Sequence, residues 1–85
     1  MVKNSELKPT SSATKLIAET VSGLIESNGL SQTEVGAIVG KSQSYASLRI
    51  KGLKPWSTDD LDALAKRFGF DNAFGLLDKA RGLSD

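Results

Sequence analysis

Charge is the chemical property that is distributed most unevenly along the sequence. No acidic residue lies between Glu34 and Asp59, and several aspartates follow this acid-free stretch. Four basic residues fall within the stretch: Lys41, Arg49, Lys51 and Lys54. Such separation can place a basic face on one side of the fold, where it attracts anionic partners. The alternative is a solvated surface on which these charges have no specific role.

Catalytic and metal-binding chemistry has few side chains to use. Histidine and cysteine are both absent, which excludes the commonest general base, the commonest metal ligand, thiolate metal sites and disulfides. Asp59, Asp60 and Asp62 lie close together, but they coincide with a predicted helix start, which favours capping over metal binding. A glycine-rich phosphate loop of the P-loop type is missing as well. We therefore expect no enzyme activity, no cofactor, no metal and no small-molecule substrate.

Length and composition are those of one small domain. The chain has 85 residues, 39% of them apolar, and a net charge of only +1. Residues 1–11 are expected to form a flexible N-terminal arm, which leaves 12–85 for the folded domain. No apolar run approaches the roughly 18 residues that cross a membrane, and no apolar segment typical of a secretory signal lies near the start. These features predict a cytoplasmic protein without membrane contact.

Apolar spacing and helix-capping residues predict five short helices and no strand. The first helix spans about residues 12–27 and ends at Gly29. Its apolar stripe contains Ile17, Val21, Leu24 and Ile25. The second helix begins after Ser31, which can form a capping box with Glu34, and it ends at Gly40.

The third and fourth predicted helices also have serine caps. Ser42 precedes the third helix, and Ser57 precedes the fourth. Asp60 completes a second capping box, and Trp56 and Leu61 are placed to form a hydrophobic staple around it. These starting signals are local, so they predict where the two helices begin without reference to the rest of the fold.

The fifth helix is predicted to start at an Asp71 cap and to stop at Gly82. It carries Phe74, Leu77 and Ala80 on one face. Phe74 and Leu77 either belong to the domain core or form a surface on which two copies of the chain pair. With short connections between the helices, the expected fold is all-α.

Glycine and serine shape the connection between the second and third helices. Gly36 places a small residue where a second helix can cross closely, and Gly40 tolerates the unusual backbone angles of a tight turn. Ser42 then caps the next helix at once. Two short helices joined in this way, at about residues 31–51, are typical of the DNA-reading helix-turn-helix.

The chain resembles the phage-repressor-like (Xre/Cro-type) helix-turn-helix family over about residues 12–80. The resemblance rests on the run GLSQTEVGAIVGKSQSYASLRIKG and on the later PWSTDDLDALAKRFGF. The Ser-x-Ser-Tyr and Pro-Trp elements are similar to a subgroup found in actinobacteria and their phages. Two positions depart from the family pattern, because Gly36 replaces the usual alanine and Arg49 replaces an apolar residue. The resemblance implies a compact five-helix lambda-repressor-like domain.

The resemblance further implies that the helix at about 42–51 lies in the major groove of double-stranded DNA. The residues then placed to contact base edges are Ser42, Gln43, Ser44, Ser47 and Leu48. The residues placed to contact the DNA backbone are Gln32, Lys41, Tyr45, Arg49, Lys51 and Lys54. Gln43 can form two hydrogen bonds to adenine, and Leu48 can contact a thymine methyl group. As alternatives, Tyr45 belongs partly to the core, and Arg49 runs along the core and pairs with an acid.

The function that follows is that of a sequence-specific transcriptional regulator, and we expect a repressor. Proteins of this design commonly bind pseudo-palindromic operators as homodimers, here through Phe74 and Leu77. One alternative is an antitoxin that represses its own operon, and another is a protein-interaction module that keeps the fold without binding DNA. The modest net charge favours the interaction module, whereas the acid-free stretch argues against it.

Overall fold

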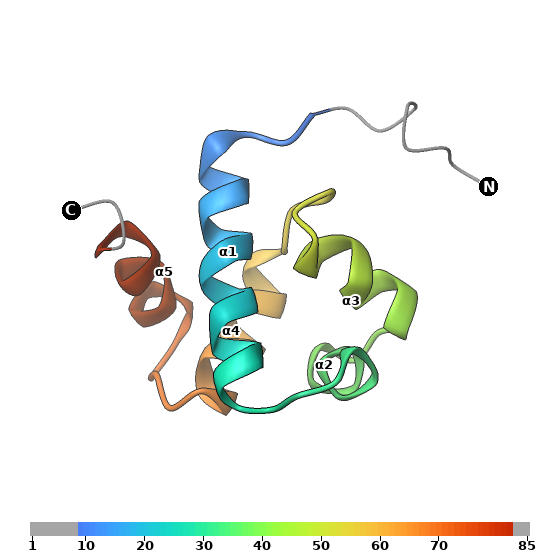
Figure 1. Ribbon diagram of the computed structural model, residues 1–85. Coiled ribbons are helices and arrows are strands. Elements are labelled where there is room, and N and C mark those ends of the chain that lie inside the picture. Colours follow the sequence, from blue (N-terminus) through green and yellow to red (C-terminus); the bar gives the residue numbers. More distant parts are fainter. Residues whose placement is uncertain (1–8, 83–85) are drawn as a thin grey trace.

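Residues 9–82 are described by the computed structural model, and within them the chain folds into five helices without a strand (Figure 1). The helices are α1 (Ser12–Ser27), α2 (Gln32–Val39), α3 (Gln43–Ile50), α4 (Thr58–Arg67) and α5 (Ala73–Gly82). The predicted all-α class is therefore confirmed. Residues 1–8, which make up most of the predicted N-terminal arm, lie outside the described residues.

Two of the helices begin with the capping boxes that the sequence predicts. At α2, the Ser31 hydroxyl accepts the backbone N–H of Glu34 at 3.1 Å, and the Glu34 carboxylate accepts the Ser31 N–H at 3.0 Å. Ser57 and Asp60 make the same reciprocal pair at α4. The Ser31 N–H also holds the pKa of the Glu34 carboxyl below its ordinary value, because the bond favours the ionised form.

The predicted start of α5 is wrong. The helix starts after Asn72 rather than at Asp71, and the Asn72 side chain accepts a backbone N–H of the first turn at 3.0 Å. The Ala73 N–H donates to the carboxylate of Asp62 on α4 at 3.1 Å. This second partner comes from a different helix, so no spacing within the α5 segment predicts it. At the other end the helix extends to Gly82, the predicted stop and the last described residue.

Every helix contributes to one apolar core. Its buried members are Val21, Ile25, Val35, Ala46, Trp56, Leu61, Leu64, Ala65 and Leu76. The predicted stripe of α1 is confirmed, because Val21 and Ile25 are buried and Ile17 and Leu24 pack against the same cluster. Four large members of the core are less than 2% exposed, so the small domain has a well-sealed centre.

The apolar face predicted for α5 is rotated relative to the observed one. Leu76 is fully buried and Ala80 is 2% exposed, while Leu77 lies at the edge of the core. Phe74 is 75% exposed. The prediction placed Phe74 on the same face as Leu77 and missed Leu76, because a ten-residue helix has several apolar positions that fit a helical period.

Helix α1 lies between two groups of helices (Figure 1). It packs against α5 on one side and against α3 on the other. Helix α4 packs against both α2 and α5, and α2 packs against α3. Of the helices in residues 9–82, none has the length and apolar character needed to span a membrane. Among the described helices, none covers the side of α3 that carries Gln43 and Ser44, both of which are exposed.

Candidate nucleic-acid interface

Gly36 lies in the middle of α2, where the helix packs closely against the turn that leads into α3. A Cβ atom built on Gly36 would lie 2.9 Å from the carbonyl oxygens of both Lys41 and Ser42. The Gly36 carbonyl accepts the Lys41 N–H at 2.8 Å, and Gly40 takes the left-handed conformation with φ 70°. The backbones thus touch where the family usually has alanine, and this explains the departure from the family pattern.

The outward side of α3 contains a shallow hollow of about 430 Å³. Its lining consists of Gln32, Gln43, Ser44, Ser47 and Leu48. The structure therefore brings together four of the five predicted base-contacting residues, with Gln32 of α2 beside them. The fifth, Ser42, is exposed just before α3, and its hydroxyl oxygen accepts the Tyr45 N–H at 3.1 Å as the helix cap.

Basic residues stand at both ends of α3. Lys41 precedes the helix and Lys51 follows it, and both are exposed, whereas Arg49 and Lys54 are half-buried. No ion pair within residues 9–82 involves any of these four residues. Their positive charge is therefore not neutralised by a neighbouring carboxylate, which suits a surface that meets phosphate groups.

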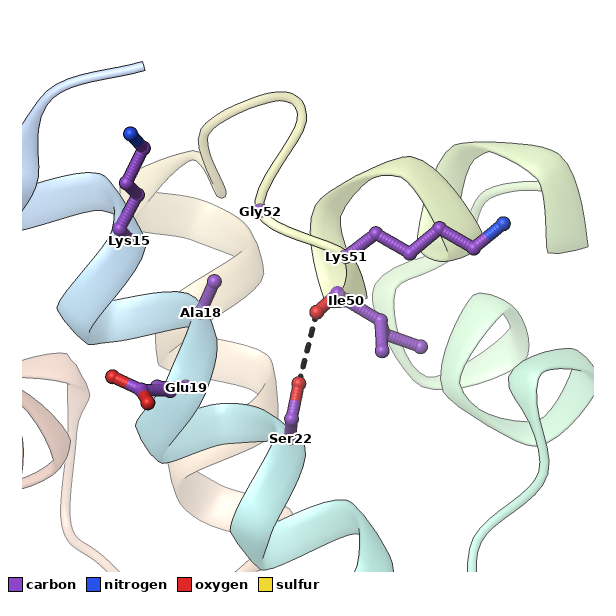
Figure 2. A pocket seen from close by; sticks show the side chains of 7 residues that line it. All are labelled: Lys15, Ala18, Glu19, Ser22, Ile50, Lys51 and Gly52. Carbon is purple, nitrogen blue, oxygen red and sulfur yellow. Dashed lines mark hydrogen bonds between the residues drawn. The ribbon is translucent and has the colours of Figure 1, made fainter. Parts of the chain in front are cut away.

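The C-terminal end of α3 is fastened to the start of the domain (Figure 2). The Ser22 hydroxyl of α1 donates to the Ile50 carbonyl at 2.9 Å, and the Thr10 hydroxyl donates to the Gly52 carbonyl at 2.9 Å. Lys15 of α1 lines a second, separate hollow beside this end of α3. The charge pattern of the sequence does not indicate Lys15, because this residue lies outside the acid-free stretch.

Tyr45 joins α3 to α4, and two cationic side chains lie over its ring. Its hydroxyl donates to the carboxylate of Asp60 at 2.5 Å. The Arg49 guanidinium lies 3.5 Å from the ring centroid, and the Lys41 ammonium lies 5.8 Å from it. Arg49 also donates to the Tyr45 carbonyl at 3.1 Å. The ring is thus a cation–π partner for two of the predicted phosphate-binding residues.

We expect the Tyr45 phenol to titrate above its ordinary pKa of about 10. The hydrogen bond to Asp60 raises the pKa of Tyr45, and burial raises it further, because both disfavour the phenolate. The protonated phenol therefore stabilises the fold below about pH 10, and this contribution is lost as the pH rises through the folded pKa. Tyr45 is the only tyrosine of the chain, so tyrosinate absorbance against pH measures this group alone.

The matched variant for this titration is Asp60→Asn. It keeps a carbonyl oxygen near the phenol but removes the negative charge, so the midpoint should move down towards that of free tyrosine. A wild-type midpoint at or below about 10 would contradict the prediction, as would an identical midpoint in both proteins.

The fold and the polar outward side of α3 together define a helix-turn-helix domain of the DNA-binding class. A family model described as helix-turn-helix matches residues 24–71, which is more than half of the chain. The protein belongs to this Xre/Cro-like helix-turn-helix family, whose members are DNA-binding regulators. Searches of curated proteins and of solved structures found no match.

Proposed function

We propose that the protein is a sequence-specific transcriptional repressor that inserts α3 into the major groove of an operator. The observation that carries the proposal is the hollow on the outward side of α3. Polar side chains and one leucine line it, and it faces away from the core. The lining residues are not needed to fill the core, so their side chains are available to a partner.

The hollow has the chemistry of a surface that contacts adenine and thymine. Gln43 presents an amide that can form two hydrogen bonds to adenine, and Leu48 can contact a thymine methyl group. Ser42, Ser44 and Ser47 can donate to or accept from several base edges. None of the lining residues is arginine or lysine, the usual partners of guanine. We infer an operator whose central contacted positions are A·T pairs.

The residues around the hollow supply the contacts to the DNA backbone. In this proposal Gln32 donates to a phosphate beside Gln43. The Tyr45 ring packs on the sugar–phosphate backbone, and the cations that contact phosphates are Lys41, Arg49, Lys51 and Lys54. Such contacts release counterions from DNA, so affinity should fall as salt rises. The net charge of +1 is no obstacle, because the acidic residues lie outside the stretch that contains α3.

A homodimer completes the proposal. Phe74 on α5 is 75% exposed, an unusual position for a large aromatic side chain, and Leu77 is half-buried on the same helix. Aromatic residues are enriched at protein interfaces. A two-fold pair formed through α5 would present two copies of α3 to half-sites about one helical turn, roughly 34 Å, apart. The operator would then be pseudo-palindromic, and the complex would form with cytoplasmic DNA.

The test is selection of bound sequences from a pool of random duplexes, at two salt concentrations. We expect an enriched two-fold-symmetric motif and an affinity that falls steeply with salt. A reporter gene placed downstream of a promoter that contains this motif should be expressed less when the protein is present. Absence of binding even at low salt would contradict the DNA-binding proposal and favour a protein-interaction module. A motif without two-fold symmetry would contradict the homodimer.

A further inference from the structure

Helix α3 has only eight residues, so its orientation depends on what fastens it to the rest of the domain. At its C-terminal end the Ser22 hydroxyl of α1 donates to the Ile50 carbonyl at 2.9 Å (Figure 2). At its N-terminal end the bond from Tyr45 to Asp60 reaches α4. Of these two hydrogen bonds, only the second uses a side chain of α3, so it adds a directional restraint to the packing of Ala46 and Ile50 against the core.

The Asp60 carboxylate, which accepts the hydrogen bond from the Tyr45 hydroxyl, is itself held in place. Asp60 is 4% exposed, and its backbone N–H donates to the Ser57 hydroxyl at 3.0 Å. The same Asp60 oxygen that accepts from Tyr45 also accepts the Ser57 N–H at 3.3 Å. A capping box of α4 thus presents a fixed charged acceptor to α3. Charge-assisted hydrogen bonds of this kind are short and strong, so the link can define a geometry.

We propose that Tyr45 is a positioning residue for base recognition, an inference that rests on the proposed DNA-binding function. Tyr45 is adjacent in sequence to Ser44 and two residues before Ser47, both of which line the outward hollow. Rotation of α3 about its axis would move these residues away from the base edges. The hydroxyl bond to Asp60 fixes the last part of this rotation, beyond what the packing of Ala46 defines, and the Arg49 guanidinium stacked on the ring follows it.

The link has a second consequence for a dimer. Helix α4, which holds Asp60, packs against α5, which carries the exposed Phe74. The bond from Tyr45 therefore connects the recognition helix to the half of the domain that bears the proposed dimer surface.

Loss of the bond from Tyr45 to Asp60 should weaken binding to the operator more than binding to DNA of unrelated sequence. Binding to unrelated DNA depends on charge and tolerates small rotations of α3.

The test compares Tyr45→Phe with Thr20→Val in binding to the selected operator and to an unrelated duplex. Tyr45→Phe removes only the hydroxyl that bonds Asp60, and it keeps the ring that supports Arg49 and packs on the DNA backbone. We expect operator affinity to fall about tenfold while affinity for the unrelated duplex stays within about twofold. Thr20→Val also removes one buried hydroxyl, which bonds only within α1 at 2.9 Å, and it should leave both affinities unchanged.

The salt dependence separates positioning from loss of a phosphate contact. Tyr45→Phe should keep the wild-type slope, since every cation remains. If the ratio of operator affinity to unrelated-duplex affinity is the same as in the wild type, whether or not both affinities fall, the positioning role is overturned. Failure of the wild-type protein to prefer any sequence would instead refute the proposed function, so the two failures are distinguishable.

Amide hydrogen exchange of the free variant gives a readout that does not involve DNA. Tyr45→Phe should exchange faster in residues 43–50 than the wild type, with α1 unchanged, because the helix has lost one local fastening. A uniform acceleration over the whole domain would indicate a general loss of stability and would also overturn the proposal.

Discussion

Replacement of Gly36 by alanine is expected to lower the free energy of unfolding by about 1–3 kcal/mol, the usual cost of overpacking. The added Cβ atom would lie 2.9 Å from the carbonyl oxygens of Lys41 and Ser42. Backbone atoms cannot rotate away as a flexible side chain can, so α2 and the start of α3 must separate. Alanine is ordinarily the better helix residue by about 0.5–1 kcal/mol, so the expected sign is opposite to helix propensity.

The control for this prediction is Gly23→Ala. Gly23 is an exposed residue within α1, and a Cβ atom there would meet nothing within 4 Å. This variant should gain about 0.5–1 kcal/mol from helix propensity alone. Thermal and urea unfolding followed by circular dichroism measure both variants. Equal stability changes at the two glycines would show that the close contact at Gly36 does not exist in solution.

Replacement of Gln43 by alanine is expected to weaken operator binding by about 1–3 kcal/mol per half-site, because a two-bond contact to adenine is lost. Repeating the selection with the variant should show no preference at one base position in each half-site. Gln43 lines the outward hollow and takes no part in the core, so the stability of the fold should not change.

Lys51→Ala provides the contrast to Gln43→Ala. Lys51 is exposed at the end of α3 and is proposed to contact a phosphate. Its loss should weaken binding to all sequences alike and reduce the salt slope by about one, with the preferred motif unchanged. If Gln43→Ala behaves in the same way as Lys51→Ala, Gln43 does not contact a base.

Features that depend on neighbours along the chain were predictable. The capping boxes at Ser31 and Ser57 are formed by residues three positions apart, and both helices begin as expected. The apolar stripe of α1 was also correct, because a sixteen-residue helix repeats its pattern over several turns. The hollow beside α3 contains Gln43, and the contact of Gln43 with a base stays a prediction.

Features that depend on contacts between helices were not predictable. The start of α5 is determined partly by Asp62, which lies eleven positions before the Ala73 N–H that it accepts. The short α5 offers several apolar positions, and only packing selects Leu76 for the core and leaves Phe74 exposed. The bond between Tyr45 and Asp60 likewise joins two helices that the sequence treats separately.

The close approach at Gly36 has a consequence for the thermodynamics of recognition. Because the backbone of α2 touches the turn before α3, the two helices cannot slide past each other without opening the contact. We therefore expect the pair to be preorganised and to meet its partner as a rigid body. Little conformational entropy is left for the protein to lose on binding, so adaptation between the two surfaces falls to the DNA, through bending and changes in groove width.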